Sequence, residues 1–162
     1  MLLYYYIIYI IFNYFFYYFI YLFVLIIYFI DPNYPIAFQS SDIDLFIYGL
    51  TAEEAIKKIE TIQETILENV VEGTVVLRTN RTLTIAAGYP HRHIQIVLRL
   101  YQSPAEVLLG FDLDCVGVGY DGTDVWALPR TRRALNYRLN IADPSRQTYR
   151  TTSYEYRLWK YR

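Results

Sequence analysis

Hydrophobic and polar residues alternate in several short runs after residue 41. The clearest run, Asp42–Tyr48, reads DIDLFIY and is followed by Gly49. A two-residue period places successive side chains on opposite faces of a strand, so this run predicts a strand with a buried face. Other apolar runs bounded by turn residues predict strands over residues 74–78, 82–86, 94–101, 111–120 and 124–128.

Helix patterns separate these predicted strands. The sequence Thr51-Ala-Glu-Glu forms a capping box, and apolar residues follow it at helical spacing, so we expect a helix over residues 51–71. Ser103 followed by Pro104 predicts the start of a short helix, and a third helix is expected over residues 131–139. The order β-α-β-β-β-α-β-β-α predicts an α+β domain: a mixed β-sheet with helices packed on it.

Residues 1–30, the apolar leader, differ from the rest of the chain. They contain nine Tyr, six Phe and no charged residue. We expect one long apolar helix of about 45 Å, enough to cross a ~30 Å hydrocarbon core as a possible transmembrane helix. Residues 31–41 then form a linker that begins with a cluster of turn-forming residues. The protein is expected at a membrane if the leader is an anchor, and in the cytoplasm or nucleus otherwise.

Two features of the apolar leader favour a different interpretation. Tyr14, Tyr17 and Tyr18 would lie near the centre of the bilayer, although Tyr prefers the membrane interfaces. Almost every residue is also one that codons of A and T alone can encode, as in translated AT-rich non-coding DNA. We therefore keep both hypotheses, a membrane anchor and a stretch of translated non-coding sequence.

Charge is divided unevenly along the remaining chain. Residues 31–129, which hold the linker and the domain expected over residues 42–129, carry 6 basic and 14 acidic residues. Residues 130–162, the basic aromatic C-terminal segment, carry 9 basic and 2 acidic residues. Arginines interleaved with Tyr and Trp suit contact with nucleic acid or phosphate. The alternative, which we favour, is that this basic segment wraps the acidic domain within the same molecule.

Asp42 and Asp44 are the strongest candidates for chemistry. Residues two apart on a strand share one face, so these carboxylates repel each other unless a cation lies between them. Mg²⁺ binds one or two carboxylates together with substrate phosphates. Such a D-x-D pair is also common at the exposed end of a strand. His91 and His93 could bind a metal through a similar spacing, but a loop leading into the next strand explains them more simply.

The stretch Ser41–Phe46, SDIDLF, resembles the core motif of the polymerase-beta-like nucleotidyltransferases, S-D-[IVL]-D-[LF] on a strand. Residues 41–161, which include RHIQIVLRLY, FDLDC and YEYRLWKY, also resemble an uncharacterised group found mostly in fungi and large viruses and often joined to ankyrin repeats. The resemblance implies metal-dependent transfer of a nucleotidyl group from a nucleoside triphosphate, with Mg²⁺ as the candidate metal. It implies that Asp42 and Asp44 bind the metal and that Ser40 and Ser41 contact the nucleotide. The acceptor, whether nucleic acid, protein or small molecule, stays open.

The resemblance also implies a third carboxylate on a later strand. The corresponding position falls on Gln95, which cannot serve as a carboxylate. Asp112 and Asp114 are the remaining candidates, Asp112 as a catalytic group and Asp114 as a metal ligand. Arg99 is expected either to bind a phosphate or to face outward from its strand.

The chain departs from the family pattern before the D-x-D strand. The family places a Gly-Gly or Gly-Ser turn and a helix there, whereas this chain has no glycine before Gly49. We therefore expect an N-terminally incomplete domain or fragment in which nucleotidyl transfer is impaired. Two alternatives remain: a catalytically inactive binding or structural module, and a small single-pass membrane protein.

Overall fold

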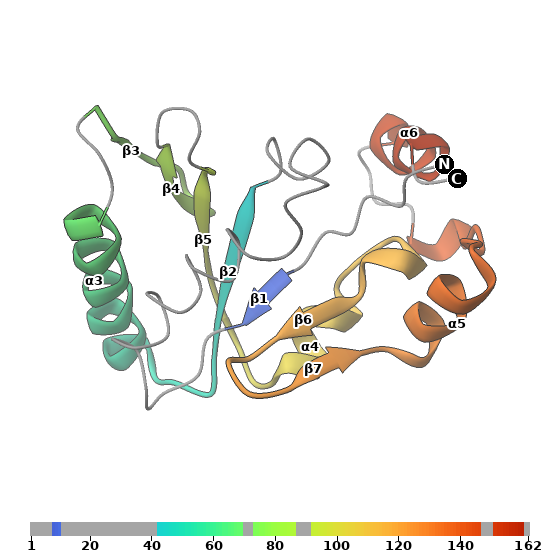
Figure 1. Ribbon diagram of the computed structural model, residues 1–162, viewed down its shortest axis with the longest axis horizontal. Helices are drawn as coiled ribbons and strands as arrows, with labels where there is room; N and C mark the ends of the chain where they lie inside the picture. Colours follow the sequence, from blue (N-terminus) through green and yellow to red (C-terminus); the bar gives the residue numbers. More distant parts are fainter. Residues whose placement is uncertain (1–7, 11–41, 70–72, 87–91, 147–150, 161–162) are drawn as a thin grey trace, which may run out of the picture.

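The computed structural model describes residues 8–10, 42–69, 73–86, 92–146 and 151–160. These residues form a mixed β-sheet in the order β3-β4-β5-β2-β1-β6-β7, with helices packed on it (Figure 1). β6, β1, β2 and β5 are parallel to one another, while β3, β4 and β7 pair antiparallel with their neighbours. The predicted α+β class is confirmed. The strands are β1 Ile8–Ile10, β2 Ile43–Tyr48, β3 Val75–Arg78, β4 Thr82–Ala86, β5 Ile94–Tyr101, β6 Val118–Tyr120 and β7 Val125–Ala127.

β2, the predicted D-x-D strand, is a central strand between β5 and β1. One face of β2 packs against α3 (Ala52–Asn69), which Figure 1 shows on one side of the sheet. Alternation along the strands turns an aliphatic residue toward α3 at every second position. The buried core between the strands and α3 consists of Ile43, Leu45, Ile47, Leu83, Ile85, Ile96, Ala55, Ile62 and Ile66.

α3 begins with the predicted capping box. The amide of Thr51 donates to Oε2 of Glu54 over 2.9 Å, and the amide of Glu54 donates to Oγ1 of Thr51 over 3.3 Å. Each side chain thereby satisfies a backbone donor that has no partner within the helix. Gly49, with φ of +69°, lets the chain turn between β2 and this cap.

The face of the sheet opposite α3 is divided along the strands. Phe46 and Tyr48, in the second half of β2, pack against Val107 and Leu108 of α4 (Pro104–Leu109). Asp44 lies on the same face in the first half of β2, because it is two residues before Phe46. This face is therefore polar where β2 starts and apolar where it ends.

Residues 8–10 correct the prediction made for the apolar leader. They form β1, with Tyr9 opposite Leu45 of β2 and Ile8 opposite Gly119 of β6. The prediction of one helix over residues 1–30 is therefore wrong at residues 8–10. These residues are Ile and Tyr, which have high strand propensity, and they add a strand to the sheet. The rest of the leader and the linker, with Ser40 and Ser41, lie outside the described residues. Within the described ranges, no helix has the length and hydropathy needed to cross a membrane.

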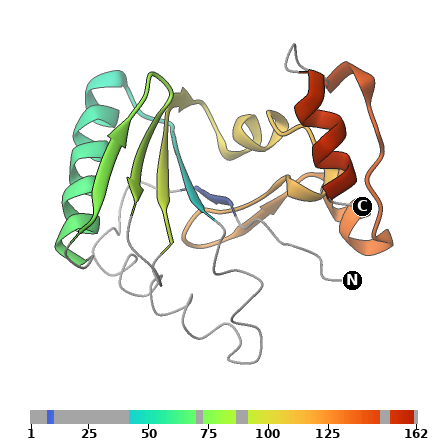
Figure 2. The same ribbon diagram turned by 90° about the horizontal axis from the view of Figure 1, so that it is seen from above.

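The chain after Gly110 differs from the single strand expected over residues 111–120. A short 3₁₀ helix, η1 (Asp114–Val116), precedes β6, in keeping with the low strand propensity of Asp. The predicted third helix is α5 (Pro129–Tyr137), and a further helix, α6 (Thr151–Lys160), was not predicted. Figure 2 shows α6 on the β6–β7 side of the sheet, at the opposite end from α3.

A truncated chain that begins at Asp31 tests the role of β1. Because β1 joins β2 to β6, its loss separates the strands β3-β4-β5-β2 from β6-β7. We expect the truncated protein to unfold at a lower urea concentration and the amides of β6 and β7 to exchange faster in hydrogen–deuterium exchange. Unchanged exchange in β6 and β7 would show instead that the leader is a separate anchor or an unrelated segment.

Candidate functional site

Four polar residues, Asp42, Asp44, His93 and Gln95, form a polar patch at the starts of β2 and β5. The parallel register places Asp44 opposite Gln95, and Asp42 and His93 each lie two residues earlier on their strand. Nδ1 of His93 lies 4.0 Å from Oδ1 of Asp42. Side chains two residues apart share a face, so the polar patch lies on the face opposite α3.

The two aspartates of the polar patch differ in environment. Asp42 is exposed, whereas Asp44 is half-buried. Burial raises the pKa of Asp44, and the negative charge of Asp42 raises it further. Both effects penalise the ionised form of Asp44, and a divalent cation bound between the two carboxylates relieves the repulsion. The chemistry of this donor pair therefore fits a hard divalent cation such as Mg²⁺.

Gln95 lies beside Asp44, on the strand where the resemblance expects a third carboxylate. Its Nε2 donates to Oγ1 of Thr84 over 3.2 Å, and the register continues the polar row Asp44, Gln95, Thr84 across β2, β5 and β4. A carboxamide offers a neutral oxygen but no negative charge. The third position of the predicted site is therefore filled by a weaker ligand for a cation.

Asp112 and Asp114, the sequence-based candidates for that third carboxylate, lie elsewhere. They precede β6, which β1 separates from β2. Oδ2 of Asp112 accepts a 2.9 Å hydrogen bond from Nη1 of Arg157 in α6. Within the described part of the chain, no three His, Cys, Asp or Glu side chains are grouped closely enough to hold a metal. The convergence expected between Asp42, Asp44 and one of these two aspartates is thus absent from the structure.

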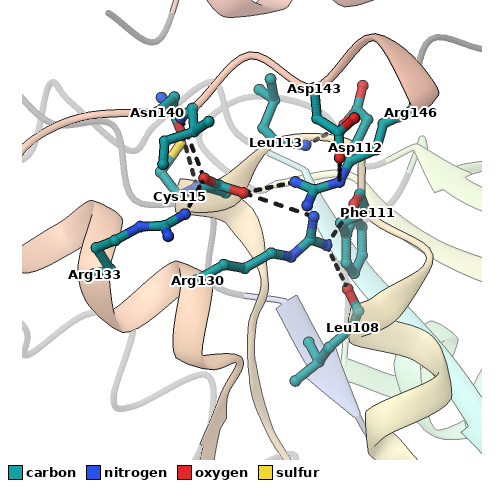
Figure 3. Close-up of polar contacts among 12 residues, drawn as sticks. Leu108, Phe111, Asp112, Leu113, Cys115, Arg130, Arg133, Asn140, Asp143 and Arg146 are labelled. Atoms are coloured by element: carbon teal, nitrogen blue, oxygen red, sulfur yellow. Dashed lines mark hydrogen bonds and ion pairs between the residues drawn. The ribbon is translucent and has the colours of Figure 1, made fainter.

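The carboxylate of Asp114 is the centre of a second group, the Asp114 cluster, whose arginines Figure 3 shows converging from α5 and from the 3₁₀ helix η2 (Pro144–Arg146). Oδ1 of Asp114 accepts a 2.7 Å hydrogen bond from Arg146, and Oδ2 accepts a 3.1 Å bond from Arg133. The amide of Ile141 also donates to Oδ2, and Nη1 of Arg130 lies 3.7 Å from Oδ1. Both oxygens are therefore engaged by partners from within the chain.

The electrostatics of Asp114 are the reverse of those of Asp44. The side chain of Asp114 is fully buried. Burial alone raises its pKa, but the hydrogen bonds from Arg146, Ile141 and Arg133 outweigh burial, so the pKa of Asp114 lies below its ordinary value. A buried carboxylate that is stabilised by internal partners has a structural role, because a metal would have to displace those partners.

Four arginines of the basic segment contact residues that precede the segment: Arg130, Arg133, Arg146 and Arg157. Besides Asp114, the guanidinium of Arg130 contacts the carbonyl of Phe111 over 2.6 Å, and Arg157 pairs with Asp112. The hydroxyl of Tyr154 in α6 accepts from the amide of Asp143 over 2.8 Å. The arginine contacts support the interpretation in which the basic segment wraps the acidic domain, whereas the Tyr154–Asp143 bond lies within the basic segment itself.

Arg99 lies far from the polar patch. It is four residues beyond Gln95 along β5, a separation of roughly 13 Å at about 3.3 Å per residue. Its guanidinium pairs with Glu106 at 3.2 Å and lies 4.8 Å from the ring centroid of Tyr101. The outward-facing alternative therefore describes Arg99 better than phosphate binding at the D-x-D strand. The contacts of Ser40 and Ser41 with a nucleotide stay predictions.

Sequence analysis missed His93 as a member of the polar patch. His93 and Gln95 repeat the spacing of Asp42 and Asp44, but the two pairs are about fifty positions apart in the sequence. Only the parallel register of β2 and β5 brings them together. The repeated spacing was a usable indication, although it gave no strand pairing.

Comparison with known proteins gives the family. The model of the Gabija anti-defense 2 family matches residues 12–138, more than half of the chain. The chain belongs to this family. The Gabija anti-defense 2 family is nucleotidyltransferase-like, in agreement with the resemblance carried by the D-x-D strand. The matched range includes residues 12–30 of the apolar leader, which favours a leader that belongs to the family's domain.

A relative of this Gabija anti-defense 2 family member comes from a large virus. An uncharacterised protein of Acanthamoeba polyphaga mimivirus is 37% identical over 136 residues, which cover 75% of this chain and 29% of the relative. The chain therefore spans less than a third of the length of that relative. No solved structure is found to match the chain. The link to ankyrin repeats stays a prediction.

Replacing Asp114 with Asn tests the Asp114 cluster. The substitution removes the charge that the arginines bind, so we expect the free energy of unfolding at pH 7 to fall by about 3 kcal/mol. The folded pKa of Asp114 is lowered, so its stabilisation is complete above the unfolded pKa of about 3.9 and is lost as pH falls through the folded pKa. Urea unfolding at several pH values measures both effects. Asp124→Asn, at an exposed turn residue, is the control, and an equal loss in both variants would contradict a structural role for Asp114.

The Asp44→Asn variant should change stability in the opposite direction. Because the folded pKa of Asp44 is raised, stability declines as pH rises from the unfolded pKa of about 3.9 through the folded pKa. Asn removes this penalty, so without divalent metal the variant should be more stable than the wild type at pH 7 and equally stable near pH 3. Urea unfolding in the presence of a chelator measures the difference. A less stable variant at pH 7 would show that Asp44 is held by a structural partner.

Proposed function

We propose that this chain is a nucleotidyltransferase-like domain that binds a nucleoside triphosphate through a divalent cation held by Asp42 and Asp44. One observation carries the proposal. The two carboxylates share one face at the start of a central strand, and burial and mutual repulsion raise the pKa of Asp44. Such a pair is stabilised by a cation and by the phosphates that the cation brings.

In this proposal, Asp42 and Asp44 set the position of the cation and supply the negative charge that binds it. Asp44 is fixed by the pairing of β2 with β5 and β1, whereas the exposed Asp42 at the strand start can adjust to a ligand. Together they offer two negative charges on a face that is not covered by α3. A bound Mg²⁺ would contribute Lewis-acid polarisation of the phosphate oxygens. Ser40 and Ser41, which directly precede the strand, are proposed to contact the nucleotide.

Gln95 supports a second candidate, a module that binds the nucleotide but transfers it poorly or not at all. Two-metal transfer of a phosphoryl group needs enough negative charge to hold both cations. The position beside Asp44 contributes a neutral amide that is already bonded to Thr84, and Asp112 and Asp114 are engaged by arginines. Nucleotide binding with impaired transfer is therefore the form of the proposal that these contacts favour.

The name of the family suggests which kind of partner or acceptor this domain has. The name Gabija anti-defense 2 describes proteins that act against a defence system. We propose that a protein or nucleic acid of such a defence system is the acceptor or partner of this domain. A membrane role is not part of the proposal, because residues 8–10 of the apolar leader form a strand of the sheet.

Isothermal titration of the full chain with ATP and Mg²⁺ tests the proposal. Asp44→Asn removes a charged ligand, so we expect the affinity for Mg²⁺-ATP to fall by at least about tenfold. Gln95→Glu adds a third carboxylate beside Asp44, so we expect tighter Mg²⁺ binding. Glu60→Gln, on the exposed surface of α3 over the opposite face, is the charge-matched control. If Asp44→Asn binds Mg²⁺-ATP as tightly as the wild type does, the D-x-D site is not where the nucleotide binds.

A further inference from the structure

β3 (Val75–Arg78) lies at one edge of the sheet, and β4 is its only neighbour among the described strands (Figure 1). All four residues of β3 are exposed, and the side chains of Val75 and Leu77 are 53% and 54% exposed. The buried core under α3 takes residues from β2, β4 and β5 but none from β3. The described part of the chain therefore buries neither face of this edge strand.

The backbone of β3 also presents hydrogen-bonding groups to the open edge. In an antiparallel pair, only every second residue of a strand exchanges hydrogen bonds with its partner strand. The amide of Thr79, directly after β3, donates to the carbonyl of Thr82 over 2.9 Å, so Thr79 is one of the residues that bond toward β4. Val76 and Arg78 lie an odd number of positions before Thr79, so they turn their amides and carbonyls away from β4.

We propose that β3 pairs antiparallel with β3 of a second copy of this chain, which joins two sheets across a two-fold axis at Val76. An edge strand normally avoids such pairing through proline, charged side chains, a bulge or a covering segment. β3 has one charged residue, Arg78 at its end, and three apolar residues before it. An interface in which both copies use the same surface closes at a dimer.

The side chains of β3 are complementary in this register. Val76 lies opposite Val76 of the second copy, Val75 lies opposite Leu77, and Arg78 lies opposite the uncharged Thr74. Every apolar residue then meets an apolar residue on its own face, which stabilises a sheet, and no like charges are opposed. An axis centred on Leu77 would instead place Arg78 opposite Val76. Because Val76 turns its backbone to the open edge, the Val76 pair also exchanges hydrogen bonds.

The size and orientation of the interface set the properties of the dimer. Two four-residue strands form a small interface, and interfaces below about 1,200 Å² in total belong to weak, transient complexes. We therefore expect a dimer that dissociates on dilution. Leu77 lies opposite Thr84, and Thr84 opposite Gln95 of the polar patch, on the face away from α3. A two-fold axis perpendicular to the sheet therefore places both polar patches on the same side of the joined sheet.

Sedimentation of the full chain from low micromolar to submillimolar concentration tests the dimer. We expect a reversible monomer–dimer equilibrium in the wild type. Val76→Lys opposes two positive charges at the axis, so the dissociation constant should rise at least about tenfold. Val125→Lys places the same substitution on β7, the other edge of the sheet, and should leave the dissociation constant unchanged.

Two results of this experiment overturn the proposal. One is a wild type that stays monomeric at the highest concentration. The other is a series of larger assemblies, because pairing of β3 with a different edge such as β7 continues from copy to copy and does not close.

Charge reversal separates a lost interface from a lost fold. Val76→Lys and Val76→Glu should each be monomeric alone, because like charges meet at the axis. An equal mixture of the two variants should form a heterodimer, since opposite charges are then opposed. A misfolded variant could not be rescued in this way. If the wild type dimerises and the mixture stays monomeric, Val76 does not lie at the axis.

Disulfide formation tests the register directly, in a Cys115→Ser background that removes the chain's one cysteine. Val75→Cys mixed with Leu77→Cys should give a covalent dimer on oxidation, because residues directly opposite each other lie within bridging distance. Either variant alone should link much more slowly, since its two thiols lie two positions out of register. Equal rates of linking in the mixture and in the single variants would contradict the proposed pairing.

Discussion

The parallel pairing of β2 with β5 on one side and β1 on the other sets the geometry of both faces of the sheet. It aligns Ile43 and Leu45 with the core under α3 and places Asp44 beside Gln95 on the opposite face. A shift of one residue would carry the aspartates into that core and expose the aliphatic side chains, at a large cost in hydrophobic burial. The polar patch therefore inherits its geometry from the packing of the opposite face.

Two D-x-D pairs in this chain have opposite electrostatics, although their sequences are alike. In Asp42-Ile-Asp44, burial and the negative charge of Asp42 raise the pKa of Asp44. In Asp112-Leu-Asp114, arginines surround the carboxylates, and the pKa of Asp114 is lowered although its side chain is fully buried. An accessible acid whose charge is not compensated within the chain is a candidate for binding a cation, whereas a compensated buried acid stabilises the fold.

The part of the molecule that follows β5 is joined to the preceding part by backbone hydrogen bonds through β1. Ion pairs around Asp114 hold this later part together. β1 places β6 in the same sheet as β2, and the Asp114 cluster joins η1 to α5 and to η2, which ends at Arg146. The family match ends at residue 138, so Arg133 lies within the matched range, while Arg146 and α6 lie beyond it. The Asp114 cluster therefore connects the matched range to Arg146, and the Arg157–Asp112 pair connects the matched range to α6.

The local elements follow from the sequence alone: the alternation in Asp42–Tyr48, the Thr51 capping box and the Ser103 N-cap each act within a few residues. The D-x-D pair was also recognisable, because two residues on one strand share a face whatever the strand pairs with. Only the tertiary structure decided that residues 8–10 join the sheet, that His93 and Gln95 lie beside the aspartates, and that Asp114 binds arginines. These outcomes depend on pairing between segments distant in sequence, which is settled by the burial and charge of the whole fold rather than by any local pattern.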